Sequence, residues 1–545
     1  MSAAPAQPLR EHSASRENLP HEIRRLLLPL LGMEALFVAL MAVAPLGGMQ
    51  QMLSPLAWHW PWLLAPARWV FGDQRIWTNI PAESVWPALA LYAALLVFAS
   101  GFLALAVRQA FCIRSASRRH LALVLGGAAL LGITLALLPA LPSNDVFSYI
   151  FYGRIVSVYH ANPLVVTPAQ YPYDPFLPLV FWQGVRSVYG PIFLDISALL
   201  TSLAHALGGS LAVYVGLFKA LGLIAHLANA LLIWAILGVV APSRRLYGTL
   251  LYAWNPLCLL EFSASAHNDV IMLTFALAGV YLLVRGLEAP ALVAFALSIA
   301  TKYVLLAVLP IYFALVIRRM LAQGTSWRGI LAGLAWRAGL LVAVLAAVIA
   351  PYWSGPRIIG SIIYSPPAQH LDNSLLDAIS WPLRSVAEVL GLSRPLAAWV
   401  VDTGLKAAGV VALVVILLRW CLRVRSGDDM LRGWTSVLFW YVVLAAGWFW
   451  PWYVTWPVAF AALLPFGPLP GAVLLLSAGA LAEYAFFPLY AAPQYGMRAW
   501  IAFGPALLYL LWSARSLMTR RPGWLTRRRW SADAAHEPVN TSDVA

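Results

Sequence analysis

Apolar runs of about twenty residues recur along almost the whole chain, and each is long enough to cross a bilayer as a helix. Hydrophobic residues make up 61% of the 545 residues and charged residues only 11%, with a mean hydropathy of +0.77. In soluble globular domains about a quarter of the residues are charged. The composition therefore excludes an ordinary soluble protein and predicts an all-α polytopic membrane protein.

Basic residues gather in the short links between the apolar runs, and this indicates how the chain crosses the membrane. The net charge is +14, but the arginines cluster in short loops, a pattern typical of the cytoplasmic loops of membrane proteins. We therefore expect the lipid bilayer as a partner and no nucleic acid. Both termini are expected to be cytoplasmic, with a disordered segment 1–25, a transmembrane domain 26–515 and a basic tail 516–545. Outer loops are expected at 47–84 and, as two large loops, at 142–190 and 352–395.

Two apolar segments conflict with this topology if each crosses the membrane once. A full crossing by 191–208 would place Arg244 and Arg245 outside, so we expect this segment to be interfacial or partly inserted. A single crossing by 290–317 would expose further arginines, and two half-helices broken near Thr301 and Lys302 remove the conflict. Non-helical backbone at membrane depth is tolerated where protein buries it or it lines a cavity. The resulting count is about ten to thirteen transmembrane helices.

One segment carries ionisable residues where the chain leaves the membrane. The apolar run 121–140 is followed by Ser143-Asn144-Asp145-Val146-Phe147-Ser148-Tyr149 and then by Gly153-Arg154. Ionisable groups at this boundary are costly to desolvate, and they are therefore candidates for function. The alternative is a solvated loop carboxylate with an arginine that reaches the interface. The Tyr- and Pro-rich continuation of the same loop favours a functional site.

Several short motifs, in this order along the chain, resemble polyprenol-phosphate-dependent glycosyltransferases of the multi-spanning GT-C class. Within that class the chain is most similar to bacterial α-mannosyltransferases related to the mycobacterial α-1,6-mannosyltransferases. One departure is Tyr303, which stands where the family's Thr-Lys motif continues with proline. The motifs are the segment 143–154 described above, Asn162-Pro163, Tyr189-Gly190-Pro191, Ala266-His267-Asn268-Asp269, Ala300-Thr301-Lys302 and Trp450-Pro451-Trp452-Tyr453-Val454.

The resemblance implies a GT-C type bundle that transfers a sugar, mannose in these relatives, from a polyprenyl-phosphate donor to a glycan or glycolipid acceptor. The acceptor hydroxyl needs a general base, and the leaving phosphate needs cations or hydrogen-bond donors. A single base and direct displacement imply an inverting enzyme. We therefore expect Asp145 as the base, Arg154, Lys302 and Arg357 at the donor phosphate, and Asn144, Tyr149, Tyr189, His267, Asn268 and Asp269 at the sugar or acceptor.

Each of these assignments has a structural alternative. Lys302 could pair with a structural acid, Arg357 could anchor a loop at the interface, and Asp269 could cap a helix that begins at Val270. His267 and Asp269 could also ligate a divalent metal; no cofactor is certain. Glu261, His370 and Asp372 are weaker candidates at the same outer end.

Two other functions fit the same architecture. A transporter or flippase of lipid-linked sugars would place charged groups along a central path through the bilayer, whereas Asp145, Asp269 and Asp372 collect at outer loop ends. A polymerase or ligase of lipid-linked glycans is harder to distinguish. No Gly-rich phosphate loop or nucleotide-sugar motif is visible, which favours a lipid-borne donor. We expect the protein in the bacterial inner membrane, with its active site on the outer, periplasmic side.

Overall fold

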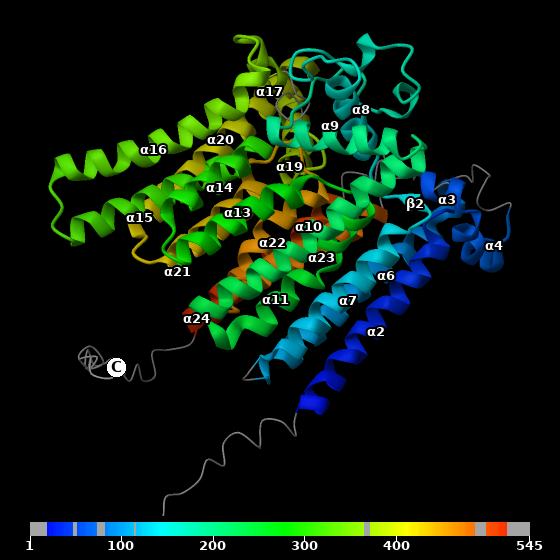
Figure 1. Cartoon of the computed structure of the whole chain (residues 1–545), viewed down its shortest axis with the longest axis horizontal. Helices are drawn as coiled ribbons and strands as arrows, with labels where there is room; N and C mark the ends of the chain where they lie inside the picture. Colours follow the sequence, from blue (N-terminus) through cyan, green and yellow to red (C-terminus); the bar gives the residue numbers. More distant parts are fainter. Residues whose placement is uncertain are drawn as a thin grey trace, which may run out of the picture.

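The computed structural model describes residues 19–46, 52–73, 82–113, 116–363, 371–485 and 498–519. These residues form a helical bundle (Figure 1). The only strands within them are β1 (Met52–Leu53) and β2 (Ala140–Leu141), which pair antiparallel. The all-α prediction is therefore confirmed.

Six of the described helices are long and apolar enough to cross a bilayer. They are α2 (Leu19–Val43), α6 (Ala82–Phe111), α7 (Arg118–Ala136), α10 (Leu211–Val240), α16 (Trp327–Ile349) and α20 (Arg394–Arg423). A seventh unit joins Pro256–Ala264 to Asp269–Val284 but bends by 119° between the two parts. Three shorter helices are also apolar, namely α9 (Pro191–Ala206), α14 (Glu288–Thr301) and α23 (Pro468–Glu483). A polytopic membrane protein is confirmed, and the count of ten to thirteen crossings remains a prediction.

The other helices connect and pack between these spans. They are α3 (Pro55–His59), α4 (Ala65–Phe71), α8 (Asp145–Ser157), α11 (Arg245–Ala253), α12 (Pro256–Leu259), α13 (Asp269–Val284), α15 (Leu309–Ala322), α17 (Gly360–Ile363), α19 (Leu375–Val389), α21 (Gly427–Trp440), α22 (Thr455–Ala461) and α24 (Arg498–Thr519). Two π-helical turns are η5 (Leu260–Ala264) and η9 (Tyr441–Ala445). Short 3₁₀ turns are η1 (Pro61–Leu64), η2 (Pro168–Gln170), η3 (Leu177–Leu179), η4 (Pro242–Arg244), η6 (Tyr303–Ala307), η7 (Ala350–Tyr352), η8 (Arg357–Ile359) and η10 (Pro451–Val454).

The two ends of the bundle differ in charge. The arginine-rich links from α10 to α11, α15 to α16 and α20 to α21 lie along the left and lower side of the molecule in Figure 1, as do the start of α2 and the end of α24. Helices α8 and α9 lie at the opposite end, in the upper part of the view. The basic links therefore share one end of the molecule, as the topology predicts.

The structure also tests the expected segment boundaries. The segment 290–317 is broken as predicted, because α14 ends at Thr301 and Lys302 is extended, with φ −156° and ψ 130°. Residues 19–25, which were expected to be disordered, are instead the first turns of α2. The last helix, α24, runs to Thr519 and so extends into the expected tail. The interfacial placement of 191–208, which corresponds to α9, remains a prediction.

Candidate active site

Helix α8 presents one acidic side chain from an otherwise buried helix. Asp145 is its first residue, and the Asp145 N–H donates to Ser143 Oγ over 3.3 Å. Acidic residues are favoured in the first turn because the helix dipole is positive there. Residues 146–155 are buried, whereas the Asp145 side chain is 17% exposed. The Asp145 carboxylate is therefore accessible to a ligand, while the buried residues 146–155 hold α8 in place.

A break in the helical backbone brings the His267-Asn268-Asp269 segment to the same place. The π turn η5 precedes Ala266, which has φ +59°, a left-handed conformation that is rare outside glycine. Gly222 of α10 permits a close approach here, because a Cβ atom at this position would lie 2.0 Å from the carbonyl oxygen of Phe262. π turns and strained residues of this kind concentrate at functional sites. All three side chains of the segment are buried.

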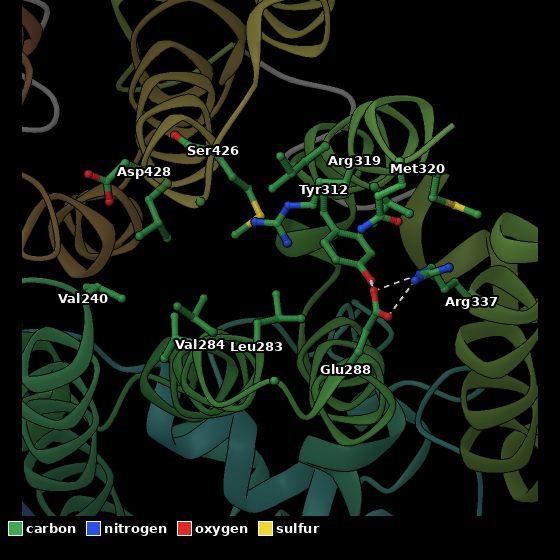
Figure 2. Close-up of a pocket in the computed structure, with 18 residues that line it drawn as sticks. Val240, Leu283, Val284, Glu288, Tyr312, Arg319, Met320, Arg337, Ser426 and Asp428 are labelled. Atoms are coloured by element: carbon green, nitrogen blue, oxygen red, sulfur yellow. Dashed lines mark hydrogen bonds and ion pairs between the residues drawn. The ribbon is translucent and has the colours of Figure 1, made fainter. Parts of the chain in front are cut away.

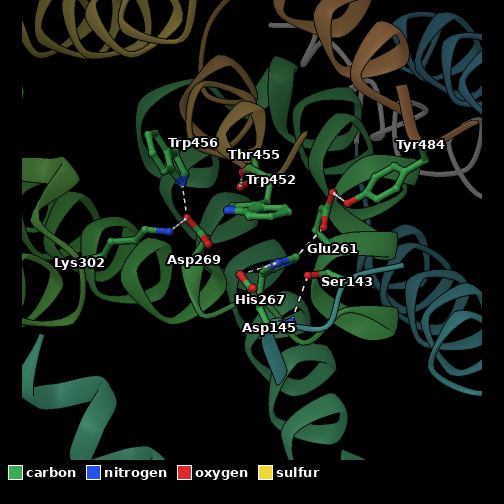
Figure 3. Close-up of polar contacts among 10 residues, drawn as sticks. All are labelled: Ser143, Asp145, Glu261, His267, Asp269, Lys302, Trp452, Thr455, Trp456 and Tyr484. Atoms are coloured by element: carbon green, nitrogen blue, oxygen red, sulfur yellow. Dashed lines mark hydrogen bonds and ion pairs between the residues drawn. The ribbon is translucent and has the colours of Figure 1, made fainter. Parts of the chain in front are cut away.

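His267 lies between two carboxylates (Figure 3). Its Nδ1 lies 2.8 Å from Glu261 Oε2, and its Nε2 lies 3.8 Å from Asp145 Oδ2. The Tyr484 hydroxyl donates to Glu261 Oε1 over 2.5 Å. The imidazole also stacks on Trp452, with ring centroids 4.0 Å apart. The two carboxylates therefore lie on opposite edges of the imidazole, with Glu261 in close contact and Asp145 at 3.8 Å, beyond hydrogen-bond distance.

Asp269 and Lys302 form a second pair beside the first. The Lys302 ammonium donates to Asp269 Oδ1 over 2.7 Å, and the Trp456 indole N–H donates to the same oxygen over 2.5 Å. Asp269 is fully buried, whereas the Lys302 side chain is 16% exposed. Asp269 is the first residue of α13, and the Asp269 carboxylate is directed at Lys302 and Trp456 (Figure 3). The alternative of a capping aspartate before Val270 is therefore wrong.

The Tyr189-Gly190-Pro191 motif joins the outer loop to the break at Lys302. The Gly190 N–H donates to the Thr301 carbonyl over 3.0 Å. A Cβ atom on Gly190 would lie 2.0 Å from the carbonyl oxygen of Ala300, so only glycine allows this contact. Tyr189 packs edge-to-face on Tyr149, whose ring centroid lies 6.5 Å from that of His267. Two segments that are far apart in the sequence thereby meet beside the site.

Arg154 is directed away from Asp145. Its guanidinium binds Asp174 through Nε and Nη2, at 3.0 and 2.8 Å, and lies over the ring of Phe176 at 4.5 Å. The Tyr159 hydroxyl donates to the same Asp174 oxygen over 2.8 Å. In the structure Arg154 thus binds a residue of the outer loop, and its expected contact with a donor phosphate stays a prediction.

The other expected site residues differ in their surroundings. Asn144 immediately precedes Asp145 and is partly buried, whereas Arg357 begins η8 and is exposed. Asn268 is buried, and neither of its side-chain amide atoms has a hydrogen-bond partner within the described residues. Such a group is costly to bury unless a ligand or water satisfies it. His370 lies outside the described residues.

Three contributors carry little signal in the sequence. Glu261 is only a weak candidate there, because it lies five residues before the Ala266-His267-Asn268-Asp269 motif and outside it. Tyr484 and Trp456 reach the site from elements that are remote along the chain. No periodicity or motif spacing links them to Glu261 or Asp269.

The possible metal ligands are directed at other partners. His267 faces Glu261 and Asp145, while Asp269 faces Lys302 and Trp456. Among the described residues no group of three His, Cys, Asp or Glu side chains has the arrangement of a metal site. Metal ligation by His267 and Asp269 therefore stays a prediction.

A cavity of about 660 Å³ lies at the other, basic end of the bundle (Figure 2). Val284, at the end of α13, lines it, whereas Asp269 at the start of the same helix belongs to the candidate site. Arg337 binds Glu288 through two hydrogen bonds of 2.8 and 2.7 Å in its wall. Because the length of α13 separates this cavity from Asp269, we do not place the reaction in it.

Comparison with known proteins gives the family relationship. Residues 57–318 match the family described as alpha-(1->6)-mannopyranosyltransferase, N-terminal domain, a range that includes Asp145, His267 and Lys302. The alpha-(1->6)-mannopyranosyltransferase A of Mycobacterium tuberculosis is 26% identical over 421 residues, which cover 73% of this chain and 74% of that enzyme. No solved structure matches the chain. The chain is thus a membrane glycosyltransferase that is similar to the α-(1→6)-mannopyranosyltransferases.

Proposed function

We propose that the protein transfers a mannosyl residue from a polyprenyl-phosphate donor to a hydroxyl group of a glycan or glycolipid. The observation that carries this proposal is the position of Asp145, a reachable carboxylate 3.8 Å from a buried histidine. The name of the mycobacterial relative supports mannose as the sugar. The lipid-borne donor is supported by the membrane setting of these residues.

Asp145 is proposed as the general base. It takes the proton of the acceptor hydroxyl while the acceptor oxygen forms a bond to the anomeric carbon of mannose. The bond from that carbon to the phosphate oxygen breaks, and its electron pair leaves with the polyprenyl phosphate. A positioned base of this kind contributes typically about 10²–10⁴-fold to the rate. One direct displacement inverts the anomeric configuration.

Lys302 is proposed to stabilise the leaving phosphate. Its ammonium group has three N–H donors, of which one is directed at Asp269. The contact with Asp269 fixes the ammonium, and the partial exposure of Lys302 allows phosphate oxygens to approach the other donors. Asn268 adds an amide without a partner among the described residues. Exposed Arg357 is a further candidate for the phosphate, and Arg154 is proposed to anchor the loop.

The outer, periplasmic face of the bacterial inner membrane is the proposed location of the reaction. The basic links and both described chain ends lie at the end opposite α8 (Figure 1), and arginine-rich loops favour the cytoplasmic side. A lipid-linked donor and a glycolipid acceptor can meet at this boundary. Tyr149 and Tyr189 lie near His267 and are proposed to contact the sugar or acceptor.

The direct test is incubation of the purified protein with polyprenyl-phosphate mannose and mannose-containing acceptors. We expect a product with one added mannose, whose new linkage has the anomeric configuration opposite to that of the donor. A product with the donor's configuration would contradict direct displacement. Movement of intact donor across vesicles without any product would instead favour a flippase.

A further inference from the structure

The cavity at the basic end of the bundle combines an apolar wall with two arginine side chains. It has a volume of about 660 Å³ and lies between α10, α13, α15, α16 and the start of α21. The guanidinium groups of Arg319 and Arg337 line it together with apolar side chains (Figure 2). Those apolar side chains include Val240, Leu283, Val316 and Leu431. The cavity therefore suits a ligand that has both an apolar chain and a charged head.

The charge of Glu288 in the cavity wall is already neutralised. The Arg337 guanidinium donates to the two carboxylate oxygens of Glu288 over 2.8 and 2.7 Å, and the Tyr312 hydroxyl donates to one of them over 2.6 Å. Contacts between arginine and both oxygens of a carboxylate are strong and directional. Arg337 and Glu288 therefore form a fixed and neutral part of the wall.

Arg319 brings a positive charge into the cavity. Its guanidinium group extends into the cavity, away from Arg337 (Figure 2). Within the part of the chain that the structure describes, Arg319 makes no hydrogen bond or ion pair. Asp428, an acid in the same wall, has a side chain that is 51% exposed and lies 3.9 Å from Arg244. The charge of Arg319 is therefore available to an anionic ligand.

Two tryptophans of α16 place this cavity near the level of the lipid headgroups. Trp327 and Trp336 are 67% and 43% exposed, and tryptophan is enriched where a membrane protein meets the headgroup region. The Arg337 guanidinium lies over the Trp336 ring, 4.5 Å from its centroid. A lipid of the adjoining leaflet can therefore bring its phosphate to the arginines while its chains stay in the apolar layer.

We propose that the cavity binds one anionic phospholipid from the leaflet at the basic end, with its phosphate on Arg319 and one acyl chain along the apolar wall. Basic pockets between transmembrane helices on the cytoplasmic side bind the headgroups of anionic lipids. A phosphodiester with a single negative charge matches the charge of Arg319, whereas a zwitterionic lipid brings a further cation next to two arginines. The proposal does not depend on Asp145 or on the sugar donor.

A lipid in this cavity meets two helices whose opposite ends carry proposed donor residues. Val284 at the end of α13 and Glu288 at the start of α14 line the cavity. The opposite end of α13 holds Asp269, and the opposite end of α14 leads into Lys302. A ligand that binds only the folded state stabilises it. Bound lipid should therefore raise the midpoint of thermal unfolding.

The test is native mass spectrometry and thermal unfolding of the full chain in detergent, titrated with three ligands. Phosphatidylglycerol supplies an anionic headgroup and acyl chains, phosphatidylcholine supplies the chains with a zwitterionic headgroup, and glycerol phosphate supplies the anion without chains. We expect phosphatidylglycerol to bind most tightly and to raise the unfolding midpoint. Phosphatidylcholine should bind more weakly, and glycerol phosphate should not bind at the same concentrations.

Two substitutions separate the charge from the apolar wall. Arg319→Gln should raise the dissociation constant of phosphatidylglycerol by about fivefold, the effect of one basic residue at an anionic lipid surface, and should weaken phosphatidylcholine less. Val284→Phe fills part of the cavity and should weaken both lipids. The matched control is Arg328→Gln, which removes an exposed arginine that does not line the cavity and should leave both dissociation constants unchanged. Without lipid, Arg319→Gln should unfold at the parental midpoint.

Three results would overturn the proposal. Equal affinity for the two phospholipids, or an equal loss in Arg319→Gln and Arg328→Gln, would show only a general attraction to the basic surface. Glycerol phosphate that binds as tightly as phosphatidylglycerol would show a site for free phosphate esters and not for a lipid. Parental binding of phosphatidylglycerol in both Arg319→Gln and Val284→Phe would place the lipid outside this cavity.

Discussion

Glu261 and His267 lie 2.8 Å apart with both side chains fully buried, and they come from the two sides of one break in the helical backbone. Glu261 in turn accepts a hydrogen bond from Tyr484. The Glu261 carboxylate therefore orients the His267 imidazole, and the imidazole in turn lies beside Asp145. Neither Glu261 nor Tyr484 needs to touch a substrate in this arrangement.

Glu261→Gln should reduce kcat by about a hundredfold, because a small misplacement of a catalytic group has an effect of this size. The glutamine keeps the size of the side chain and can still accept from Tyr484, but it removes the charge beside His267. The measurement is the turnover number at saturating donor and acceptor. Tyr484→Phe should have a smaller effect in the same direction. Parental turnover in Glu261→Gln would show that the pair has no part in orienting the site.

Lys302→Met should weaken donor use and also destabilise the protein. The substitution leaves the carboxylate of Asp269 buried without its cation, a change that typically costs about 3–5 kcal/mol of unfolding free energy. Adding Asp269→Asn removes that buried charge. The double variant should therefore recover thermal stability but retain a raised KM for the donor. If the double variant also recovers the parental donor KM, Lys302 is a structural residue.

Gly190→Ala should disrupt the junction between the outer loop and the broken helix. The added Cβ would lie 2.0 Å from the Ala300 carbonyl oxygen, which is backbone and cannot rotate away. We expect a lower midpoint of thermal unfolding and a loss of transfer. Gly184→Ala is the matched control, since nothing lies within 4 Å of its added Cβ. Equal stability of the two variants would contradict the tight contact at Gly190.

Cysteine labelling tests the orientation in the membrane. In a background without Cys112, Cys258 and Cys421, single cysteines placed next to Asp145 and Arg357 should react with an impermeant thiol reagent in intact cells. A cysteine in the link between α15 and α16 should react only after the membrane is opened. The reverse pattern would place the site on the cytoplasmic side.

Sequence reasoning was strongest where charge and length constrain the chain together. The arginines near 318 and 319 required an even number of crossings, and this predicted the break at Lys302 that the structure contains. Short motifs also indicated which segments meet near Asp145.

Long-range pairing could not be predicted in the same way. Arg154 carries a charge suited to a phosphate, but Asp174 neutralises it, and nothing in the sequence specifies that partner. Tyr484 binds Glu261 across 223 positions. Residues 19–25 contain several polar and charged residues before an apolar run, which predicted a disordered segment, but α2 already begins at Leu19.

The central claim is that Asp145 is the base of the transfer, and the turnover of Asp145→Asn with polyprenyl-phosphate mannose tests it most directly. The asparagine keeps the shape of the side chain but cannot take the proton of the acceptor hydroxyl. We predict that turnover falls by at least about two orders of magnitude, while thermal unfolding matches the parent and the control Asp73→Asn remains active. Near-parental turnover of Asp145→Asn would contradict the claim.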